Sequence, residues 1–227
     1  MQDAGPGVQR AGVGVGIVFD LDNTLVHSHI DFKGIRRDIG DLLLSAGVVR
    51  EPIVTEGPKR RSIGQVIELG EQHDREHGTQ LGGQMWHLVE EYERAGMRLA
   101  TVEPDAVPTL AELRRRGSPL GVLTNNSHTA ALEALHKFSL LPYIDAVLGR
   151  EDVPAMKPSP SGLHVARERF GSRAAEIMMV GDSYLDGLAA KGADCPYVAF
   201  RPRLGELEEH GITPIAVITD LRELLDL

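Results

Sequence analysis

The chain has 227 residues, of which 42% are apolar and 25% charged, and its formal net charge is −9. These proportions are ordinary for one large globular domain or a domain with an insertion, and they exclude a wholly disordered chain. The acidic surplus argues against a general nucleic-acid-binding protein. It also means that a binding site for an anion needs a metal ion or a local cation.

The lone cysteine, Cys195, rules out an internal disulfide, and this fits the reducing cytoplasm, where we expect the protein to act. No apolar run approaches the roughly 20 residues that span a bilayer, so we expect no membrane partner. Residues 1–15 are glycine-rich and lack the apolar core of a signal peptide, which predicts a flexible leader. We expect a monomer or a homodimer.

The first predicted strand, residues 16–20, is a short apolar run that ends in Asp20. The alternation of strands and helices is then interrupted, because no convincing strand is found from about residue 26 to residue 101. Helical spacing there predicts three helices, at 30–46, 62–76 and 80–99. We interpret this stretch as an inserted helical module, with hinges near 26–30 and 99–102.

Beyond the insertion, strands and helices alternate. The predicted strands are 119–124, 146–149, 176–182, 197–200 and 215–218, and the predicted helices are 104–116, 127–137, 161–170 and 184–192. Asp220 and Glu223 have the spacing of a reciprocal helix cap. This alternation predicts a parallel sheet with helices on both faces, which binds its ligand at the carboxyl ends of the strands.

Four short motifs fall at those predicted ends. They are DLDNT at 20–24, LTNN at 123–126, MKPSP at 156–160 and GDSYLD at 181–186. Taken together they supply a carboxylate nucleophile, a second acid, a hydroxyl, a fixed cation and a carboxylate pair for a metal. This set suits the transfer of a phosphoryl group to an aspartate and then to water.

Asp20 and Asp22 lie two residues apart, so in an extended chain both point the same way. One carboxylate must be ionised to attack phosphorus, while the other must hold a proton for the leaving oxygen. In isolation, such a pair is equally typical of two exposed turn aspartates beside a helix cap. The hydroxyl of Thr124 suits phosphate oxygens, with Asn125 and Asn126 adding donors or steadying the loop, although an ordinary strand-to-helix cap has the same pattern.

Lys157 precedes Pro158, which restricts its backbone to extended forms, and a fixed ammonium there would offset charge in the transition state. A solvated surface lysine is the alternative. Asp182 and Asp186 are four residues apart, which places both on one side of a helix. An oxygen cluster that includes Asp20 suits Mg²⁺. Asp182 could equally cap the helix 184–192.

As an ordered set, the four motifs resemble the haloacid dehalogenase-like (HAD) hydrolase superfamily. The insertion after the first motif resembles the helical cap of its phosphoglycolate phosphatase-like subgroup. The resemblance implies an α/β fold with a Rossmann-like parallel sheet core and helices on both faces, plus an inserted all-helical cap domain. The implied boundaries are a core of residues 16–26 and 102–227 and a cap of residues 27–101.

The resemblance also implies the role of each site residue. Asp20 is the expected nucleophile and Asp22 the general acid/base; Asp22 also argues against the dehalogenase branch, which lacks an acid there. The expected phosphate-binding residues are Thr124, Asn125 and Lys157, and the expected Mg²⁺ ligands are Asp20, Asp22 through its carbonyl, Asp182 and Asp186. Asn23 stands where many phosphoglycolate-type members carry glycine, so phosphoglycolate is not singled out as substrate.

In this superfamily the cap usually selects the substrate, which leaves nine candidates here: His27, His29, Asp31, Arg36, Arg37, Lys59, Arg60, Arg61 and Trp86. Trp86 is interpreted first as cap core. The basic residues 58–61 and the His73–His77 pair, spaced for a transition metal, are each more typical of a solvated face.

We therefore expect a Mg²⁺-dependent phosphatase acting on a small-molecule phosphate monoester. A phosphomutase of the same superfamily, and a phospho-ligand sensor without turnover, are the alternatives.

Overall fold

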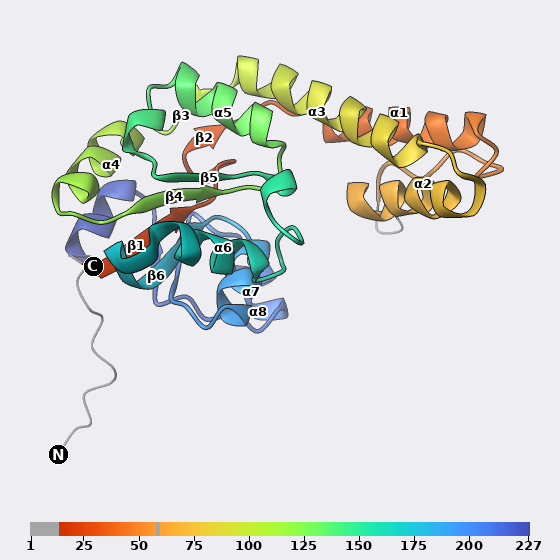
Figure 1. The fold of residues 1–227 in the computed structure, drawn as a ribbon. Coiled ribbons are helices and arrows are strands. Elements are labelled where there is room, and N and C mark those ends of the chain that lie inside the picture. Colours follow the sequence, from red (N-terminus) through yellow and green to blue (C-terminus); the bar gives the residue numbers. More distant parts are fainter. Residues whose placement is uncertain (1–13, 58–59) are drawn as a thin grey trace. The chain divides into compact units, whose positions relative to one another are not determined.

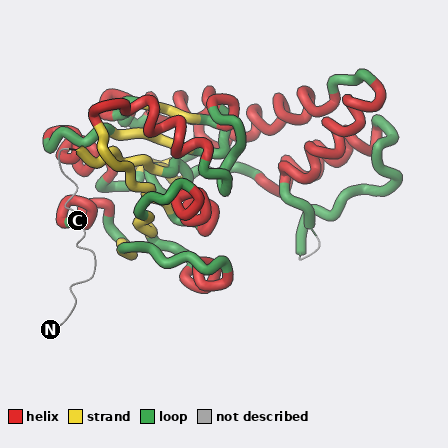
Figure 2. Tube along the Cα trace, turned by 60° about the horizontal axis from the view of Figure 1, so that its bottom comes forward, coloured by secondary structure: helices red, strands yellow, loops and turns green. Residues whose placement is uncertain are grey.

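The computed structural model describes residues 14–57 and 60–227 of the chain (Figure 1). It divides into two compact units. The sheet unit holds the described residues up to Ser28 together with Ala100–Leu227, and the helical unit holds His29–Leu99. Strands and helices occur together in the sheet unit, whereas the helical unit holds helices joined by loops, as the colours in Figure 2 show. Most of the predicted flexible leader lies outside the described residues.

The sheet unit is organised around six parallel strands in the order β5-β4-β1-β6-β7-β8. Their bounds are β1 Gly14–Phe19, β4 Leu120–Leu123, β5 Ala146–Leu148, β6 Ala174–Gly181, β7 Tyr197–Phe200 and β8 Ala216–Ile218. Strand β1 begins two residues before the predicted start and lies at the centre, between β4 and β6. A central strand that is covered on both faces requires the continuous apolar run seen in its sequence.

Close packing at the centre of the sheet depends on two glycines. Gly16 on β1 and Gly121 on β4 both face the ring of Phe170, and an added Cβ would lie 2.5 Å and 3.0 Å from that ring. The ring is fully buried there and joins the core cluster between the sheet and its helices. A larger residue at either glycine would push Phe170, and the helix that it ends, away from the sheet.

Helices cover both faces of the sheet (Figure 1). On one face lie α4 (Ala106–Arg115) and α5 (His128–Lys137), and on the other lie α6 (Ser161–Phe170), α7 (Tyr184–Gly192) and α8 (Leu204–Glu209). The 3-10 helices are η1 Leu141–Tyr143, η2 Arg150–Asp152, η3 Gly171–Arg173 and η4 Leu221–Asp226.

The predicted cap at Asp220 is confirmed, although the segment that it starts is the 3-10 helix η4. The Asp220 carboxylate accepts the Arg222 N–H at 2.8 Å, and Glu223 accepts the Asp220 N–H at 2.9 Å.

The helical unit consists of α1 (Phe32–Ser45), α2 (Ile63–His77) and α3 (Leu81–Leu99). Ser62 and Gln65 form a capping box that starts α2, and Gly78 ends it in a left-handed conformation. All three helices bury one apolar face against the others, with Ile35, Ile67 and Met85 among the fully enclosed side chains. The described helices include none long and apolar enough to cross a membrane.

The expectation that no strand lies between residues 26 and 101 is wrong at both ends. Val26–His27 (β2) and Thr101–Val102 (β3) pair as a two-stranded antiparallel ribbon within the sheet unit. Strands of two residues are too short to show an alternating pattern in the sequence. The predicted fold class is otherwise confirmed: a parallel α/β core, helices on both faces, and an inserted helical module.

Candidate active site

The four motifs meet at the carboxyl edge of the sheet. Asp20 follows β1 and donates its N–H to Val180 of β6 at 2.8 Å. Thr124 follows β4, and Asp182 follows β6. Because β4, β1 and β6 are neighbours, their parallel ends bring these three side chains to one place.

Lys157 is the centre of a buried charge network. Its Nζ lies 2.5 Å from Asp20 Oδ1 and 2.6 Å from Asp186 Oδ1, and the lysine side chain is only 4% exposed. Burial alone would lower the pKa of Lys157, but the charges of Asp186 and Asp20 outweigh burial and raise it. The lysine is therefore a fixed cation beside Asp20, and the solvated-lysine alternative is wrong.

Asn125 fixes the backbone of that lysine. Its side-chain amide donates to the Lys157 carbonyl at 2.9 Å and accepts the Lys157 N–H at the same distance. The two hydrogen bonds tie the end of β4 to the loop before α6. The structure thus gives the Asn125 side chain a positioning task, which agrees with the alternative that it steadies the loop; its contact with phosphate stays a prediction.

Asp20, Asp182 and Asp186 form a carboxylate cluster whose nearest oxygens lie within 4.8 Å of one another. Burial and the neighbouring Asp186 raise the pKa of Asp182 to about 6. Burial also raises the pKa of Asp20, against the opposing charge of Lys157. If fully ionised, three carboxylates and one ammonium carry a net charge of minus two, which a divalent cation would cancel. Hard oxygen donors of this kind fit such a cation.

Asp186 is held in place from several directions. Its Oδ2 accepts the Ser183 hydroxyl at 2.7 Å and the Ser183 N–H at 3.1 Å, and the carboxylate is fully buried. The N-cap of α7 is Ser183, so the alternative that Asp182 caps this helix is wrong. The sequence did contain a signal for this, since serine followed three residues later by an acid is a capping pattern.

Gly181, the glycine of the last motif, is required for a steric reason. A Cβ on Gly181 would lie 2.5 Å from the Asp186 Oδ2, so any larger residue would displace that carboxylate. Tyr197 of β7 supports the same turn, because its hydroxyl donates to the Gly181 and Ser183 carbonyls at 3.0 and 3.1 Å. No pattern in the sequence indicated a role for this tyrosine.

Asp22 lies in a different environment from Asp20. Its Oδ2 accepts a hydrogen bond from the Asn126 amide, while its Oδ1 is buried and has no partner among the described residues. Burial raises the pKa of Asp22, against opposing hydrogen bonds from Ser28 and Asn126. A raised pKa and an unpartnered oxygen both make this carboxyl easier to protonate than an exposed aspartate.

Thr124 is 2% exposed, and its hydroxyl oxygen accepts the Asn126 N–H at 3.2 Å. The hydroxyl proton remains available for an acceptor. The helix that follows, α5, is capped by Ser127, which accepts the Ala130 N–H at 3.1 Å. The cap and the motif threonine are thus separate residues, so Thr124 itself is not needed as the cap.

A hollow of about 470 Å³ opens beside Asp182 in the sheet unit, lined by Asn23, His27, Asp182, Ser183, Arg201, Arg203 and Glu206. Arg201, which lines this hollow, donates two hydrogen bonds to the Glu103 carboxylate, at 2.9 Å each. The Glu103 side chain is 1% exposed. Glu103 also pairs with His27 at 2.7 Å. Glu103 thus links Arg201, which follows β7, to His27. His27 and Glu103 lie on the two chain segments that lead to the helical unit.

Three of the remaining substrate-selection candidates have structural contacts within the helical unit. Asp31 caps α1, Arg37 pairs with Asp38, and Trp86 is half-buried with its indole N–H on Glu71. The other described candidates are His29, Arg36, Arg60 and Arg61, and Lys59 lies outside the described residues.

His73 and His77 stack at 4.2 Å between ring centroids. Neither belongs to a group of three metal-binding side chains in the part of the chain that the structure describes.

Comparison with known proteins agrees with this geometry. A family model for haloacid dehalogenase-like hydrolase matches residues 16–194. The chain is 32% identical to a phosphoglycolate phosphatase of Neisseria meningitidis over 92% of both chains. It is 34% identical to that of Neisseria gonorrhoeae over 79% of this chain and 76% of the relative.

Among solved structures, a HAD phosphatase from Thermococcus onnurineus matches with a TM-score of 0.60 and 26% identity, over 93% of this chain and 96% of that one. The chain therefore belongs to the haloacid dehalogenase-like hydrolase family, in its phosphoglycolate phosphatase-like branch.

Proposed function

We propose that the protein is a Mg²⁺-dependent phosphatase that hydrolyses a small-molecule phosphate monoester through an aspartyl-phosphate on Asp20. The observation that carries this proposal is the difference between two carboxyls two residues apart. Burial raises the pKa of both carboxyls, but Asp20 is in direct contact with the ammonium of Lys157, which favours its ionised form. Asp22 has the neutral amide of Asn126 as its partner and a buried, unpartnered oxygen that has room for a proton.

This pair supports a two-step reaction in which atoms and charges balance. A carboxylate oxygen of Asp20 attacks phosphorus, the bond to the ester oxygen breaks, and Asp22 gives its proton to the departing alkoxide. Asp22 then takes a proton from water, whose oxygen attacks the phosphorus. The bond to Asp20 breaks and inorganic phosphate leaves. Both residues end in their starting states.

The neighbouring residues would stabilise charge during these steps. Lys157 is fixed by Asn125, so its ammonium need not reorganise as charge builds on the phosphoryl oxygens. The Thr124 hydroxyl has a proton to donate to such an oxygen. Asp20, Asp182 and Asp186 would hold Mg²⁺, with the Asp22 carbonyl as a further proposed ligand, and the ion would supply positive charge to the phosphate oxygens.

We propose the helical unit as the cap domain that selects the substrate. Phosphoglycolate is the first substrate to assay, because the Neisseria relatives carry that activity in their names. Asn23 does not argue against it. Its φ is +57°, a left-handed conformation that asparagine tolerates better than most residues and glycine adopts freely.

The test is phosphate release from a panel of phosphate monoesters that includes phosphoglycolate, with Mg²⁺ and with EDTA. Asp20→Asn is the inactive variant, because an amide cannot form the phosphoenzyme. Asp41→Asn, which changes an exposed aspartate of α1, is the matched control. We expect Mg²⁺-dependent release from the unaltered protein and from Asp41→Asn, and none from Asp20→Asn.

Release that persists in Asp20→Asn would overturn the assignment of the nucleophile. Release that is unaffected by EDTA would overturn the metal requirement. If Asp20 becomes phosphorylated but turnover needs an added sugar bisphosphate, the mutase alternative replaces the phosphatase.

A further inference from the structure

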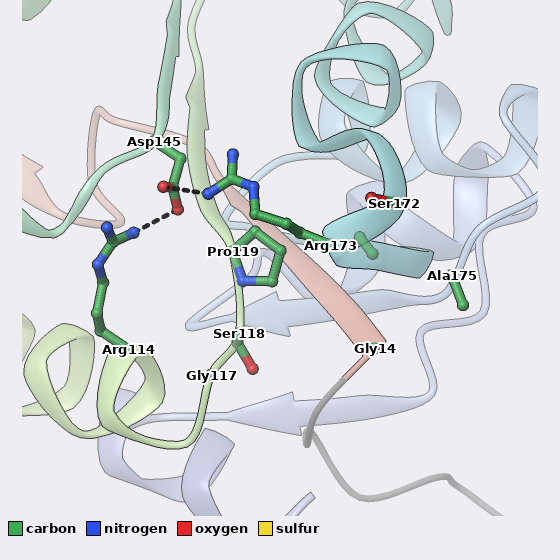
Figure 3. A pocket seen from close by; sticks show the side chains of 10 residues that line it. Gly14, Arg114, Gly117, Ser118, Pro119, Asp145, Ser172, Arg173 and Ala175 are labelled. Atoms are coloured by element: carbon green, nitrogen blue, oxygen red, sulfur yellow. Dashed lines mark hydrogen bonds and ion pairs between the residues drawn. The ribbon is translucent and has the colours of Figure 1, made fainter.

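A second hollow lies at the opposite edge of the sheet, where β1, β4, β5 and β6 begin (Figure 3). Its volume is about 610 Å³, and its lining includes Gly14, Arg114, Ser118, Pro119, Asp145 and Arg173. Strand β1 has six residues and so separates this hollow from Asp20 by roughly 20 Å. No residue of the four motifs takes part in it, so the proposed phosphatase chemistry does not account for it.

Asp145 holds two arginines side by side at one end of this hollow (Figure 3). Its Oδ1 accepts Nη1 of Arg173 at 2.6 Å, and its Oδ2 accepts Nη1 of Arg114 at 2.5 Å. The Leu120 N–H adds a third hydrogen bond at 3.0 Å, and the carboxylate is 8% exposed. Asp145 thus accepts three hydrogen bonds and holds two guanidinium groups, one from α4 and one from η3.

The two arginines carry more positive charge than Asp145 neutralises, and their side chains are 43% and 52% exposed. Two guanidinium groups and one carboxylate carry a net charge of plus one, in a chain whose overall charge is −9. Each arginine contacts Asp145 through Nη1 alone, and Nε and Nη2 of both have no partner among the described residues. A single arginine would have sufficed to neutralise Asp145. Guanidinium donors in a fixed pair are suited to a carboxylate or phosphate group.

The same hollow contains an independent sign of a missing partner. Ser118 is 2% exposed, yet its Oγ forms no hydrogen bond with any described residue. Buried hydroxyls nearly always have a hydrogen-bond partner, because an unpaired buried hydroxyl is destabilising. Ser118 lines the hollow together with the apolar side chains of Pro119, Ala174 and Ala175. A volume of this size is in the range of small-molecule sites, which run from about 300 to 1,000 Å³.

We propose that this hollow is a binding site for a small organic anion. One carboxylate or phosphate group of the ligand lies against Arg114 and Arg173, and its body lies along Pro119 and Ala174. Rotation of the Ser118 side chain brings its buried hydroxyl to a polar group of the ligand. The site adjoins the starts of four strands, and three of them, β1, β4 and β6, deliver active-site residues at their other ends. An occupant would therefore contact the sheet that positions those residues.

The test is a titration of the full chain, followed by amide chemical shifts in two-dimensional NMR. The probes are inorganic phosphate and acetate, added separately at constant ionic strength with chloride as the balancing anion. The amides of Ser118, Arg173 and Ala175 report on the hollow, and that of Asn126 reports on the catalytic edge. We expect saturable shifts at the hollow with at least one probe. Saturation by phosphate or by acetate identifies which group the site prefers.

Three variants test whether Arg114 and Arg173 bind the anion. Arg114→Gln and Arg173→Gln each remove one guanidinium while the other still pairs with Asp145, so both should fold. Each is expected to weaken binding at the hollow about tenfold or more and to leave the Asn126 response unchanged. Arg115→Gln is the matched control, because Arg115 is 73% exposed, pairs with Glu112 and does not line the hollow.

The absence of saturable shifts with both probes would overturn the proposal. So would equal binding by Arg114→Gln, Arg173→Gln and Arg115→Gln. The proposed phosphatase activity is measured by a different assay and would stand or fall separately.

Discussion

Replacing Lys157 with methionine tests the charge network at its centre. Methionine has a similar length and no charge, so the substitution removes the ammonium without leaving a large cavity. Asp20 and Asp186 would then face each other with no cation between them. Both carboxylates are buried, with side chains 9% and 0% exposed, and the nearest oxygens of the cluster lie within 4.8 Å.

The cost can be worked from this distance. Two unit charges 4.8 Å apart repel by about 3.5 kcal/mol at an effective dielectric constant of about 20. Breaking a buried ion pair by removing one partner typically costs about 3–5 kcal/mol, which agrees. For a chain of this size the metal-free protein should lose roughly 7–14 °C in melting temperature. Added Mg²⁺ should stabilise the variant more than the unaltered protein, since the ion replaces the lost charge.

The assay is thermal unfolding followed by circular dichroism, with EDTA and with Mg²⁺, alongside phosphate release. Lys191→Met is the control, because Lys191 is exposed and its Nζ meets only the Gly211 carbonyl, at 3.2 Å. The reasoning is refuted if Lys157→Met in EDTA melts within about 2 °C of Lys191→Met, or if Mg²⁺ stabilises both variants equally. Catalysis should fall at least 100-fold in Lys157→Met alone.

Substitutions at three further positions test the surroundings. Gly181→Ala places a methyl group against Asp186 and should weaken Mg²⁺ binding tenfold or more by isothermal titration; an unchanged affinity would contradict the steric argument. Glu103→Gln weakens the bidentate pair with Arg201 and should cost about 2 kcal/mol in urea unfolding, whereas a loss below about 0.5 kcal/mol would show the link to be dispensable. Asn23→Ala should cost about 1 kcal/mol and Asn23→Gly far less, as measured by the same unfolding; equal losses would refute the role of the left-handed backbone.

Much of the fold follows from local sequence patterns. The apolar runs that end in Asp20, Thr124 and Asp182 each became a strand of the parallel sheet, because a strand covered on both faces needs such a run. Helical spacing located the helices on either side to within a few residues, except for the six-residue α8, which was not predicted. The ribbon of β2 and β3 was missed, since two residues cannot display a period.

The candidate site was only partly accessible to the same reasoning. The motif residues could be placed at one edge because parallel strands share a direction. Their mutual contacts depend on side-chain packing between distant segments, so the sequence did not reveal Asn125 holding Lys157 or Asn126 holding Asp22. The pair of arginines on Asp145 comes from segments about thirty residues to either side, and no local pattern connects them.

The most direct test of the central claim is to find the phosphoryl group on the protein. The enzyme would be mixed with its best substrate and Mg²⁺, quenched in acid within milliseconds, digested and analysed by mass spectrometry. The account predicts one added phosphoryl group on the peptide that contains Asp20, and none when Asp20→Asn is treated in the same way. Turnover at the full rate with an unmodified Asp20 peptide at every quench time, or the phosphoryl group on another residue, would contradict it.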